Sequence, residues 1–304
     1  MQSKLVKSPL NYIGGKYKLL KQITPLFPNN IDTMVDLFCG GCNVGINVNA
    51  KKIIAIDKLD VLINIMNIFK KLNSHDIISI IEANINKFNL SNTSKYGYDY
   101  YNVNSSDGLA KVNKKNFLKL RNYINHITNK DSVEYYILLY TLIIFSFNNQ
   151  IRFNSKGKFN VPVGKRDFNK KIRNNLLNFI ERLHSINIEF ICDDFRHYDY
   201  NRLDKNDFVY ADPPYLITCA TYNEQNSWTE TDEIDLLNLL DFLNDRGIKF
   251  ALSNVLESKG KSNDILKKWS KKYNVNYLNY SYKNSNYQIK NKNSKSVEVL
   301  ITNY

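Results

Sequence analysis

Short apolar runs and longer stretches with a helical repeat alternate along most of this chain. Five short runs predict buried strands, at residues 33–38, 52–56, 187–191, 207–210 and 248–253. Helical patterns at 232–244 and 262–271 follow the later runs, and the runs 277–282 and 296–302 are typical of a closing hairpin. Strands that alternate with helices predict an α/β fold with a mostly parallel sheet.

The alternation is interrupted between the second and third predicted strands. Residues 59–171 form a stretch rich in helical patterns, tyrosine, lysine and asparagine, and its part at 89–106 has the composition of a flexible segment. An insertion of this length is too long for a loop. We therefore expect a discontinuous domain formed by residues 1–58 and 172–304, and an inserted, mainly helical domain at 59–171.

Positive charge is concentrated in two places. The whole chain has a formal charge of +13, and between Phe147 and Arg173 eight Lys and Arg face the single acid Asp167. A second stretch, 282–295, carries four lysines and no acid. Such clusters favour a polyanionic partner such as nucleic acid. A solvated charged surface, or the Lys and Asn usage of an AT-rich genome, remains the alternative.

Other features exclude several classes of protein. No apolar run approaches the roughly 20 residues that cross a bilayer, so we expect a soluble, cytoplasmic protein. Four cysteines form no disulfide framework, and no second pair or histidine cluster completes a zinc site with Cys39 and Cys42. We expect free thiols and no metal. A phosphate-binding loop fails at Leu10 and Tyr17, where it requires Gly and Ser or Thr.

An acid follows each of the first four predicted strands. Ligands of open α/β sheets bind beyond the carboxyl ends of the strands, so these positions are where chemistry is expected. Taken singly, each acid is typical of a helix N-cap or a turn. Packing alone does not predict four in succession. They lie in the segments Asp36-Leu37-Phe38-Cys39-Gly40-Gly41, Asp57, Asp193-Asp194-Phe195 and Asp212-Pro213-Pro214-Tyr215.

These motifs together resemble the Dam-type, alpha-class DNA adenine-N6 methyltransferases, which use S-adenosylmethionine. The resemblance spans nearly the whole chain, in the order of that family. It implies a Rossmann-like methyltransferase sheet, with residues 59–171 as a target-recognition domain carrying a β-hairpin. The segments that carry it are NYIGGKYKLL (11–20), DLFCGG (36–41), IIAID (53–57), RFNSKGKFNVPVGKR (152–166), CDDF (192–195), DPPY (212–215) and SKSVEVLITN (294–303).

The resemblance assigns catalysis to Asp212, Pro213, Pro214 and Tyr215. The lone pair of an exocyclic amine is delocalised into the ring, so acceptors must engage both N6 hydrogens and favour a tetrahedral nitrogen. In the family the carboxylate of Asp212 and the carbonyl of Pro213 are those acceptors, and the prolines hold them in place. Tyr215 stacks on an adenine that has been flipped out of the duplex.

The resemblance also implies a cofactor site for S-adenosylmethionine. An N-terminal motif closes over the cofactor, a turn surrounds its methionine part, Asp57 binds the ribose, and two residues hold its adenine. The motif at 38–42 departs from the family at Cys42, where the usual residue is glycine, and a left-handed backbone there would be strained. The set assigned to the cofactor is Tyr12, Gly14, Lys16, Asp36, Phe38, Gly40, Asp57, Asp194, Phe195 and Asp212.

DNA contacts are expected from the hairpin of the inserted domain. In the family the arginine matching Arg152 reads a guanine edge, as Arg commonly does; a phosphate contact or simple exposure is the alternative. Family members often modify GATC or longer sites beginning GAT, although Asn149 and Gln150 stand where relatives carry glycine and an apolar residue. The residues assigned to DNA are Asn148, Arg152, Asn154, Pro162, Lys165 and Arg166.

The expected protein is thus a site-specific adenine-N6 methyltransferase of duplex DNA that is monomeric in solution. A cognate restriction endonuclease is a candidate partner. The DPPY tetrad also occurs in enzymes resembling RNA adenine and protein glutamine methyltransferases, and a non-catalytic DNA-binding protein could share the basic domain. The hairpin argues against the first two alternatives, and the acids after each strand argue against the third.

Overall fold

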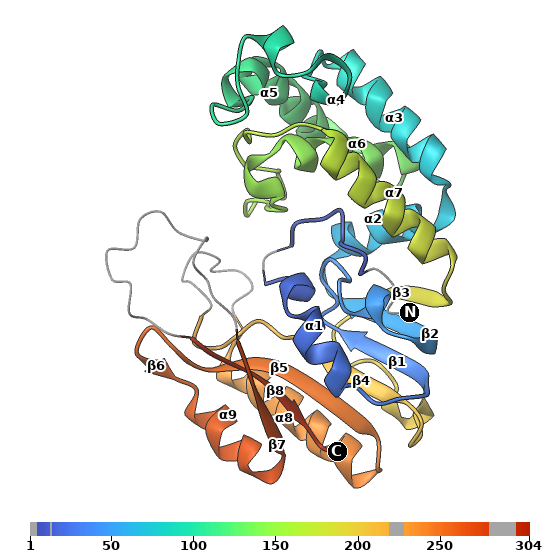
Figure 1. Ribbon diagram of the computed structural model, residues 1–304, viewed down its shortest axis with the longest axis vertical. Coiled ribbons are helices and arrows are strands. Elements are labelled where there is room, and N and C mark those ends of the chain that lie inside the picture. Colours follow the sequence, from blue (N-terminus) through green and yellow to red (C-terminus); the bar gives the residue numbers. More distant parts are fainter. Residues whose placement is uncertain (1–4, 13, 219–227, 280–295) are drawn as a thin grey trace. The chain divides into compact units, whose positions relative to one another are not determined.

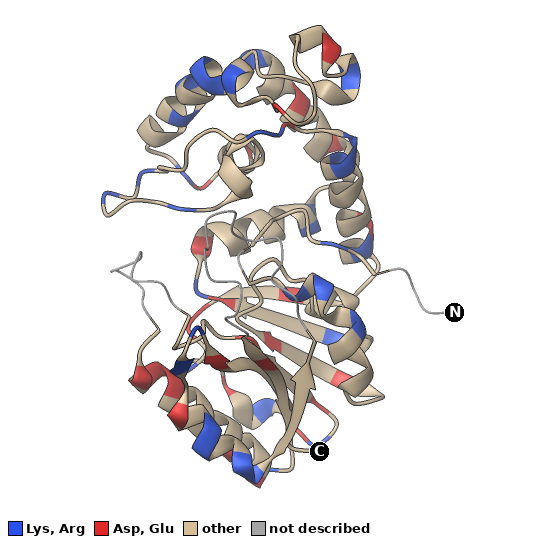
Figure 2. Ribbon diagram, turned by 60° about the vertical axis from the view of Figure 1, so that its left-hand side comes forward, with Lys and Arg blue, Asp and Glu red and all other residues tan. Residues whose placement is uncertain are grey.

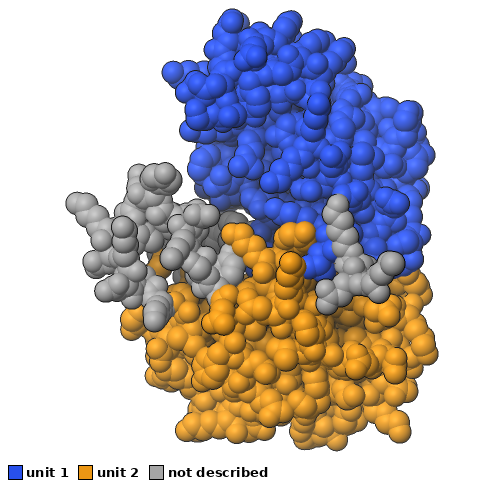
Figure 3. Space-filling view, viewed as in Figure 1, with its two compact units in different colours: residues 1–15, 59–186 blue, residues 16–58, 187–304 orange. Residues whose placement is uncertain are grey.

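The computed structural model describes residues 5–12, 14–218, 228–279 and 296–304. The chain divides into two compact units, one of residues 1–15 and 59–186 and one of residues 16–58 and 187–304 (Figure 3). The predicted boundary at 58/59 coincides with a unit boundary, whereas residues 1–15 and 172–186 group with the inserted unit. Which functional domain those residues serve stays a prediction.

The second unit contains one mixed sheet. Its strand order is β3-β2-β1-β4-β5-β8-β7, and β6 pairs with β5. Strands β1 to β5 run parallel, and β8 is antiparallel to both β5 and β7 (Figure 1). This confirms the predicted α/β class. The strands are β1 Ile31–Leu37, β2 Ala50–Asp57, β3 Ile188–Cys192, β4 Phe208–Ala211, β5 Lys249–Ser258, β6 Lys261–Ser262, β7 Asn274–Leu278 and β8 Val297–Thr302.

The strand order reverses between β1 and β4. From β1 the chain adds β2 and β3 on one side, and from β4 it adds β5 on the other. Leu37, the last residue of β1, is paired with Ala211, the last residue of β4. Crevices for ligands in open α/β sheets form at such a reversal, outside the carboxyl ends of the strands.

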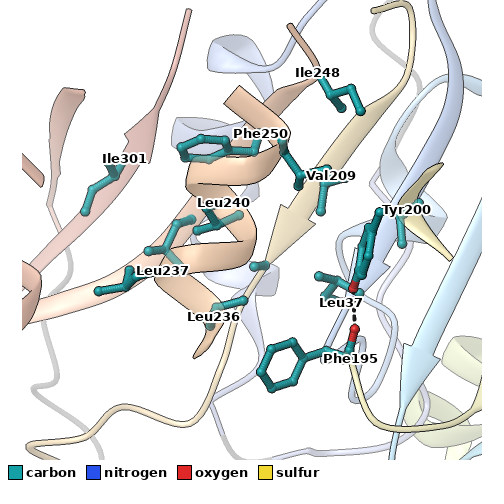
Figure 4. Close-up of a cluster of buried hydrophobic side chains, with 14 of the residues drawn as sticks. Leu37, Phe195, Tyr200, Val209, Leu236, Leu237, Leu240, Ile248, Phe250 and Ile301 are labelled. Atoms are coloured by element: carbon teal, nitrogen blue, oxygen red, sulfur yellow. Dashed lines mark hydrogen bonds between the residues drawn. The ribbon is translucent and has the colours of Figure 1, made fainter. Parts of the chain in front are cut away.

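Helix α8, Glu230–Asp245, covers one face of this sheet. Its leucines at positions 236, 237, 240 and 243 recur at helical spacing and are buried. Figure 4 shows Leu236, Leu237 and Leu240 facing Val209 of β4 and Phe250 of β5. A capping box formed by Thr229 and Asp232, three residues later, satisfies backbone N–H groups at the start of α8. The other helices of the unit are the short α1, Leu20–Ile23, and α9, Asp264–Trp269.

The first unit is helical, as predicted. Helix α6, Val133–Phe145, is buried at every position from Tyr135 to Phe145 and packs against α2, α3 and α5. A helix that is apolar on all sides belongs in the centre of a bundle. No helix in the described part of the chain is long and apolar enough to cross a membrane. The other helices are α2 Asp60–Lys71, α3 Ser74–Lys87, α4 Thr93–Tyr96, α5 Ala110–His126 and α7 Lys170–His184.

The predicted hairpin follows α6. Antiparallel bridges join Ser146 to Val163 and Phe153 to Phe159. Asn125 of α5 holds the second arm, because its amide donates to the Phe159 carbonyl at 3.1 Å and its oxygen accepts from the Phe159 N–H at 2.8 Å. Helix α5 therefore holds the second arm of this hairpin in place through Asn125.

Between β1 and β2 the chain forms a short 3₁₀ helix at Gly45–Asn47. The segment 89–106, expected to be flexible, begins with a buried anchor. The Ser91 and Thr93 hydroxyls donate to the Asp167 carboxylate at 3.1 and 2.7 Å. That carboxylate is fully buried, so Asp167 ties the segment down.

Candidate active site

The tetrad Asp212-Pro213-Pro214-Tyr215 follows β4 at the reversal of the strand order. Its first residue donates a backbone hydrogen bond from the Asp212 nitrogen to the Leu37 carbonyl at 3.3 Å, which joins the tetrad to the end of β1. Pro213 is buried, Pro214 is exposed and Tyr215 is half-buried. The Asp212 side chain keeps 17% of its surface exposed. The tetrad can therefore meet a ligand from solution while its backbone is held by the sheet.

The Asp212 carboxylate is held from two sides. The Lys16 ammonium lies 2.7 Å from one of its oxygens and 2.8 Å from the other. The Tyr215 hydroxyl donates to it at 3.1 Å. The same ammonium lies 3.9 Å from the carboxylate of Glu298 and 5.0 Å from the centre of the Tyr215 ring. Lys16 itself is 4% exposed, so its charge acts mainly on the tetrad and is little screened by solvent.

Burial and neighbouring groups act on the pKa of Asp212 in opposite directions. Burial raises it above the ordinary value and is the largest effect, whereas the Lys16 charge and the hydrogen bonds from Lys16 and Tyr215 lower it. The result is a raised pKa. Lys16 is therefore the group that keeps Asp212 able to ionise in a buried setting.

The turn after β1 has an unusual backbone. Phe38, Gly40 and Cys42 all have positive φ, at 60°, 50° and 55°. Gly40 adopts this conformation freely, but for Phe38 and Cys42 it is strained, at a cost on the order of 1–3 kcal/mol each. Cys42 therefore has the left-handed backbone that was expected to be strained at a non-glycine residue. Its thiol is fully buried.

Two carboxylates hold this turn. Asp57, at the end of β2, accepts from the Gly40 N–H at 2.9 Å, and Asp36, in β1, accepts from the Gly45 N–H at 2.9 Å. A side chain at position 45 would meet the Asp36 oxygen at 2.8 Å, so only glycine fits there. The pKa of Asp36 is raised to about 7, mainly by burial, while the Gly45 hydrogen bond lowers it and the nearby charges of Asp212 and Asp57 add to the rise. Three acids are thus gathered at one edge of the sheet.

The loop after β3 presents an aromatic cluster. Phe195 is 4% exposed, and its ring lies 5.3 Å from Phe38 and 5.9 Å from Trp228, centre to centre. Its carbonyl accepts from the Tyr200 hydroxyl at 2.6 Å (Figure 4). Asp194, assigned to the cofactor's adenine, forms an ion pair with Arg196 at 3.1 Å. The structure therefore brings Phe38 and Phe195 together, and their part in a cofactor site stays a prediction.

Tyr12 and Gly14, the remaining residues assigned to the cofactor, belong to the helical unit. Tyr12 is 36% exposed, and its carbonyl accepts from the Gly15 N–H at 3.2 Å. Gly14 has φ of 83°, a conformation that favours glycine. Their part in a cofactor site stays a prediction.

Among the residues assigned to DNA, Arg152 and Asn154 lie on the hairpin and shape it. Nε of Arg152 donates to the Asn160 side-chain oxygen at 2.8 Å, and Nη2 donates to the Asn160 carbonyl at 3.3 Å. The Asn154 side chain accepts from the backbone N–H groups of Lys156 and Lys158, both at 3.0 Å, and so fixes the tip. The hairpin thus offers a defined side-chain arrangement rather than a loose loop.

The other assigned residues flank the hairpin. Asn148 has φ of 54°, and its carbonyl accepts from the Asn11 amide at 2.9 Å. The Pro162 carbonyl accepts from the backbone N–H of Phe147 at 2.8 Å. Lys165 and Arg166 are exposed. The second basic stretch, 282–295, lies outside the described residues.

Comparison with known proteins identifies the family. The model of the D12 class N6 adenine-specific DNA methyltransferases matches residues 12–297. The chain belongs to this family. It is 46% identical over 305 residues to the type II methyltransferase M.FokI of Planomicrobium okeanokoites, covering 98% of this chain and 43% of that protein. Modification methylase StsI of Streptococcus sanguinis is 45% identical over 309 residues, covering 99% and 43%. The DNA adenine methylase of Haemophilus influenzae is 28% identical over 216 residues, covering 71% and 66%.

Membership of the D12 class confirms the resemblance inferred from the motifs. The chain nevertheless spans less than half the length of the M.FokI and StsI proteins. In the described part of the chain no group of three or more His, Cys, Asp or Glu could hold a metal ion. Cys39, Cys42 and Cys192 are free thiols, as predicted, and the fourth cysteine, at position 219, lies outside the described residues.

Several residues of the site were not found from the sequence. Glu298, in β8, was a single acid within an apolar strand pattern, and that mismatch was the available signal. The Lys16–Asp212 pair joins positions 196 residues apart, so no local pattern reveals it. Trp228 lies just before α8 and Glu233 lies in its first turn. The apolar repeat of this helix predicts which leucines are buried, but it does not predict a role for these two residues.

Proposed function

We propose that this chain transfers a methyl group from S-adenosylmethionine to the N6 amine of a flipped-out adenine in duplex DNA. The observation that carries the proposal is the tetrad at the reversal of the strand order, with the Asp212 carboxylate partly exposed and clamped by Lys16. Membership of the D12 class supports the same reaction.

The residues at this edge of the sheet fit S-adenosylmethionine. Its sulfonium and α-ammonium groups are positive, and the site gathers Asp36, Asp57 and Asp212 closely enough for their charges to raise the pKa of Asp36. Phe195 provides aromatic surface for its adenine, and its ring lies beside Phe38 of the turn assigned to the methionine part. Asp57 lies at the end of β2, where an acid binds ribose hydroxyls in related folds. When bound, S-adenosylmethionine supplies an electrophilic methyl group.

The chain's own part in the reaction is to hold the target amine. The Asp212 carboxylate and the Pro213 carbonyl accept the two N6 hydrogens, so the nitrogen lone pair is directed towards the methyl group. With the cofactor bound, the nitrogen would take the methyl group from the sulfonium, S-adenosylhomocysteine would leave with the electron pair of the broken S–C bond, and the surplus N6 proton would pass to solvent. Because the Tyr215 hydroxyl now donates to Asp212, we expect the incoming base to replace that hydrogen bond and the Tyr215 ring to stack on it.

Charge in the helical unit supports a DNA substrate. Residues 59–186 carry 19 Lys and Arg against nine Asp and Glu, which accounts for +10 of the formal +13. Figure 2 shows Lys and Arg in blue along the helices and the hairpin of this unit. Helix α5 contributes exposed lysines and no acid, and its Arg121 donates to the Val161 carbonyl of the hairpin at 3.3 Å. Those exposed lysines are Lys111, Lys114, Lys115 and Lys119.

We expect the α5 lysines to neutralise DNA phosphates and Arg152 to read a base. Arg152 donates from Nε and from one Nη2 hydrogen to Asn160. Its Nη1 group and the outer Nη2 hydrogen are left to donate to a guanine edge. We propose a target containing GAT, of which GATC is one form. The names of the relatives as a type II methyltransferase and a modification methylase support a role beside a cognate restriction endonuclease.

Labelled-methyl transfer to duplex DNA tests the reaction. We expect incorporation by the wild-type chain and none by Asp212→Ala, whereas Asp245→Ala, an exposed aspartate at the end of α8, should behave as wild type. Equal incorporation by Asp212→Ala would refute the assigned site. Incorporation into RNA but not DNA would favour an RNA adenine methyltransferase, and DNA binding without transfer would favour a non-catalytic DNA-binding protein.

The DNA contacts have a separate test in the salt dependence of binding. Each phosphate contact adds about 0.9 to the slope of log K against log salt concentration, so Lys115→Gln with Lys119→Gln should reduce that slope by about 2. The matched pair Lys268→Gln and Lys271→Gln, both exposed in the sheet unit, should leave it unchanged. Losing Arg152 should relax base choice at one position more than it weakens binding.

A further inference from the structure

A carboxylate that has no cationic partner among the described residues is buried beside the aromatic cluster. Glu233 lies in the first turn of α8 and is 1% exposed. Its three partners in the described part of the chain are neutral: Nε1 of Trp228 donates to one oxygen at 2.6 Å, and the amides of Asn254 and Asn263 donate to the other at 3.2 and 2.9 Å. A buried carboxylate is costly unless it is fully hydrogen-bonded, so this arrangement requires a reason.

The two amides can face Glu233 in one orientation only. The side-chain oxygen of Asn254 accepts from the Val255 N–H at 2.7 Å, and that of Asn263 accepts from the Leu266 N–H at 3.0 Å, where it caps α9. Each amide therefore presents its NH₂ group to Glu233, and the indole can only donate. A residue that accepts on both oxygens is needed to satisfy all three donors. Of the side chains of this size, only glutamate does so.

The indole held in this way supports the rings assigned to the cofactor. Trp228 stands edge-on to Phe38, with ring centres 5.4 Å apart and planes at 84°, and it also contacts Phe195. Phe38 has φ of 60°, which a bulky side chain rarely adopts. The position of the Phe38 ring therefore depends on the side chains packed around it, and Trp228 is one of them.

Acids near the start of α8 also hold the loop after β3, through Arg196. Arg196 pairs with Asp194 at 3.1 Å, with Asp232 at 2.6 Å and with Asp235 at 2.8 Å. Its guanidinium lies 4.5 Å from the centre of the Phe195 ring. The start of α8 thus contacts the loop after β3 through Arg196. It also contacts Trp228 of the aromatic cluster through Glu233.

We propose that Glu233 is a positioning residue for the cofactor site: through Trp228 it fixes the ring of Phe195, assigned to the adenine of S-adenosylmethionine, and the ring of Phe38, assigned to the turn around its methionine part. This rests on the proposed function, because the cofactor role of the two phenylalanines belongs to it. Glu233 does not touch the reacting atoms. Its effect reaches the cofactor through the indole hydrogen bond.

Glu233→Gln separates this role from support of the fold. The two oriented amides can still donate to the single Gln oxygen, so the bonds to β5 and α9 remain while the Gln NH₂ group faces the indole N–H. We expect a folded protein whose dissociation constant for S-adenosylhomocysteine rises about tenfold, with KM for S-adenosylmethionine raised more than kcat is lowered. Glu230→Gln, an exposed glutamate in the same turn, should bind as wild type.

A double-mutant cycle tests whether Glu233 acts through Trp228. Trp228→Phe keeps an aromatic ring but removes the indole donor. If the indole bond carries the effect, Glu233→Gln combined with Trp228→Phe binds S-adenosylhomocysteine no more weakly than the worse single variant. Additive losses would overturn the proposal, because Glu233 would then act through the two amides. Unchanged binding by Glu233→Gln would overturn it as well.

Tryptophan emission gives a readout that needs no ligand. The chain has two tryptophans, so Trp269→Phe leaves Trp228 as the single emitter. In that background Glu233→Gln should shift the Trp228 emission, and an unchanged spectrum would contradict the positioning role. If the Trp269→Phe chain with Glu233 intact binds no S-adenosylhomocysteine, the proposed function fails instead. The two failures are therefore distinguishable.

Discussion

Replacing Lys16 by Met tests how the buried site keeps Asp212 ionised. Met has an unbranched side chain one atom shorter than that of Lys and carries no charge. With the ammonium 2.7 Å from the carboxylate, their attraction is on the order of 6 kcal/mol at an effective dielectric constant of about 20, before desolvation offsets part of it. Removing one partner of a buried pair typically costs about 3–5 kcal/mol. Asp212 can avoid much of that cost by taking up a proton.

The acid limb of the pH profile reports that proton. Lys16 lowers the pKa of Asp212 against burial, so its loss raises that pKa further. Because the proposed reaction requires the ionised carboxylate, the acid limb of kcat/KM should move to higher pH by more than about one unit, each unit being worth 1.36 kcal/mol. Lys21→Met, an exposed lysine of α1, is the control. An acid limb that stays in place, or moves to lower pH, would refute the reasoning.

Stability gives an independent check on the same variant. A carboxyl group whose folded pKa is raised holds its proton more tightly in the native state, so its contribution to stability is lost as pH rises through the folded pKa. The destabilisation caused by Lys16→Met should therefore be small at low pH, where Asp212 is neutral, and grow as pH rises. Urea unfolding at several pH values measures it. A loss that shrinks with rising pH would contradict the assignment.

Three further predictions concern single positions. The Tyr140 hydroxyl is buried with no hydrogen-bond partner in the described structure, so Tyr140→Phe should raise the free energy of unfolding in urea by about 1–3 kcal/mol; a loss would count against it. The pKa of Asp36 is raised to about 7, so Asp36→Asn should gain stability relative to wild type as pH rises from 6 to 9, and a constant difference would disprove this. A side chain at Gly164 would lie 2.3 Å from the Ser146 carbonyl, so Gly164→Ala should weaken DNA binding relative to wild type; an unchanged affinity would contradict the proposed role of the hairpin.

Much of the sheet could be predicted because its signal is local. Parallel strands are buried on both faces and appear as continuous apolar runs, and the predicted runs overlap β1 to β5. The acids at the strand ends were found for the same reason, although Asp36 lies within β1 and Asp57 is the last residue of β2, whereas Asp212 directly follows β4. The gathering of Asp36, Asp57 and Asp212 at one edge then followed from parallel topology alone.

The remaining features depend on contacts between distant parts of the chain. Asp167 looked like a lone acid in a basic stretch, but its partners Ser91 and Thr93 lie more than 70 residues earlier and bury it. The positive φ of Cys42 is set by the turn that Asp36 and Asp57 hold, which spacing does not reveal. Tertiary hydrogen bonds of this kind leave no periodic trace in the sequence.

The identity of the methylated atom tests the central claim most directly. Duplex DNA is incubated with the chain and S-adenosylmethionine carrying a labelled methyl group, digested to nucleosides and separated. We predict that the label is found in N6-methyladenine, at one adenine within a GAT-containing site, and that Asp212→Ala leaves the DNA unlabelled. Label on cytosine, or the same labelled adenine produced by Asp212→Ala, would contradict the account.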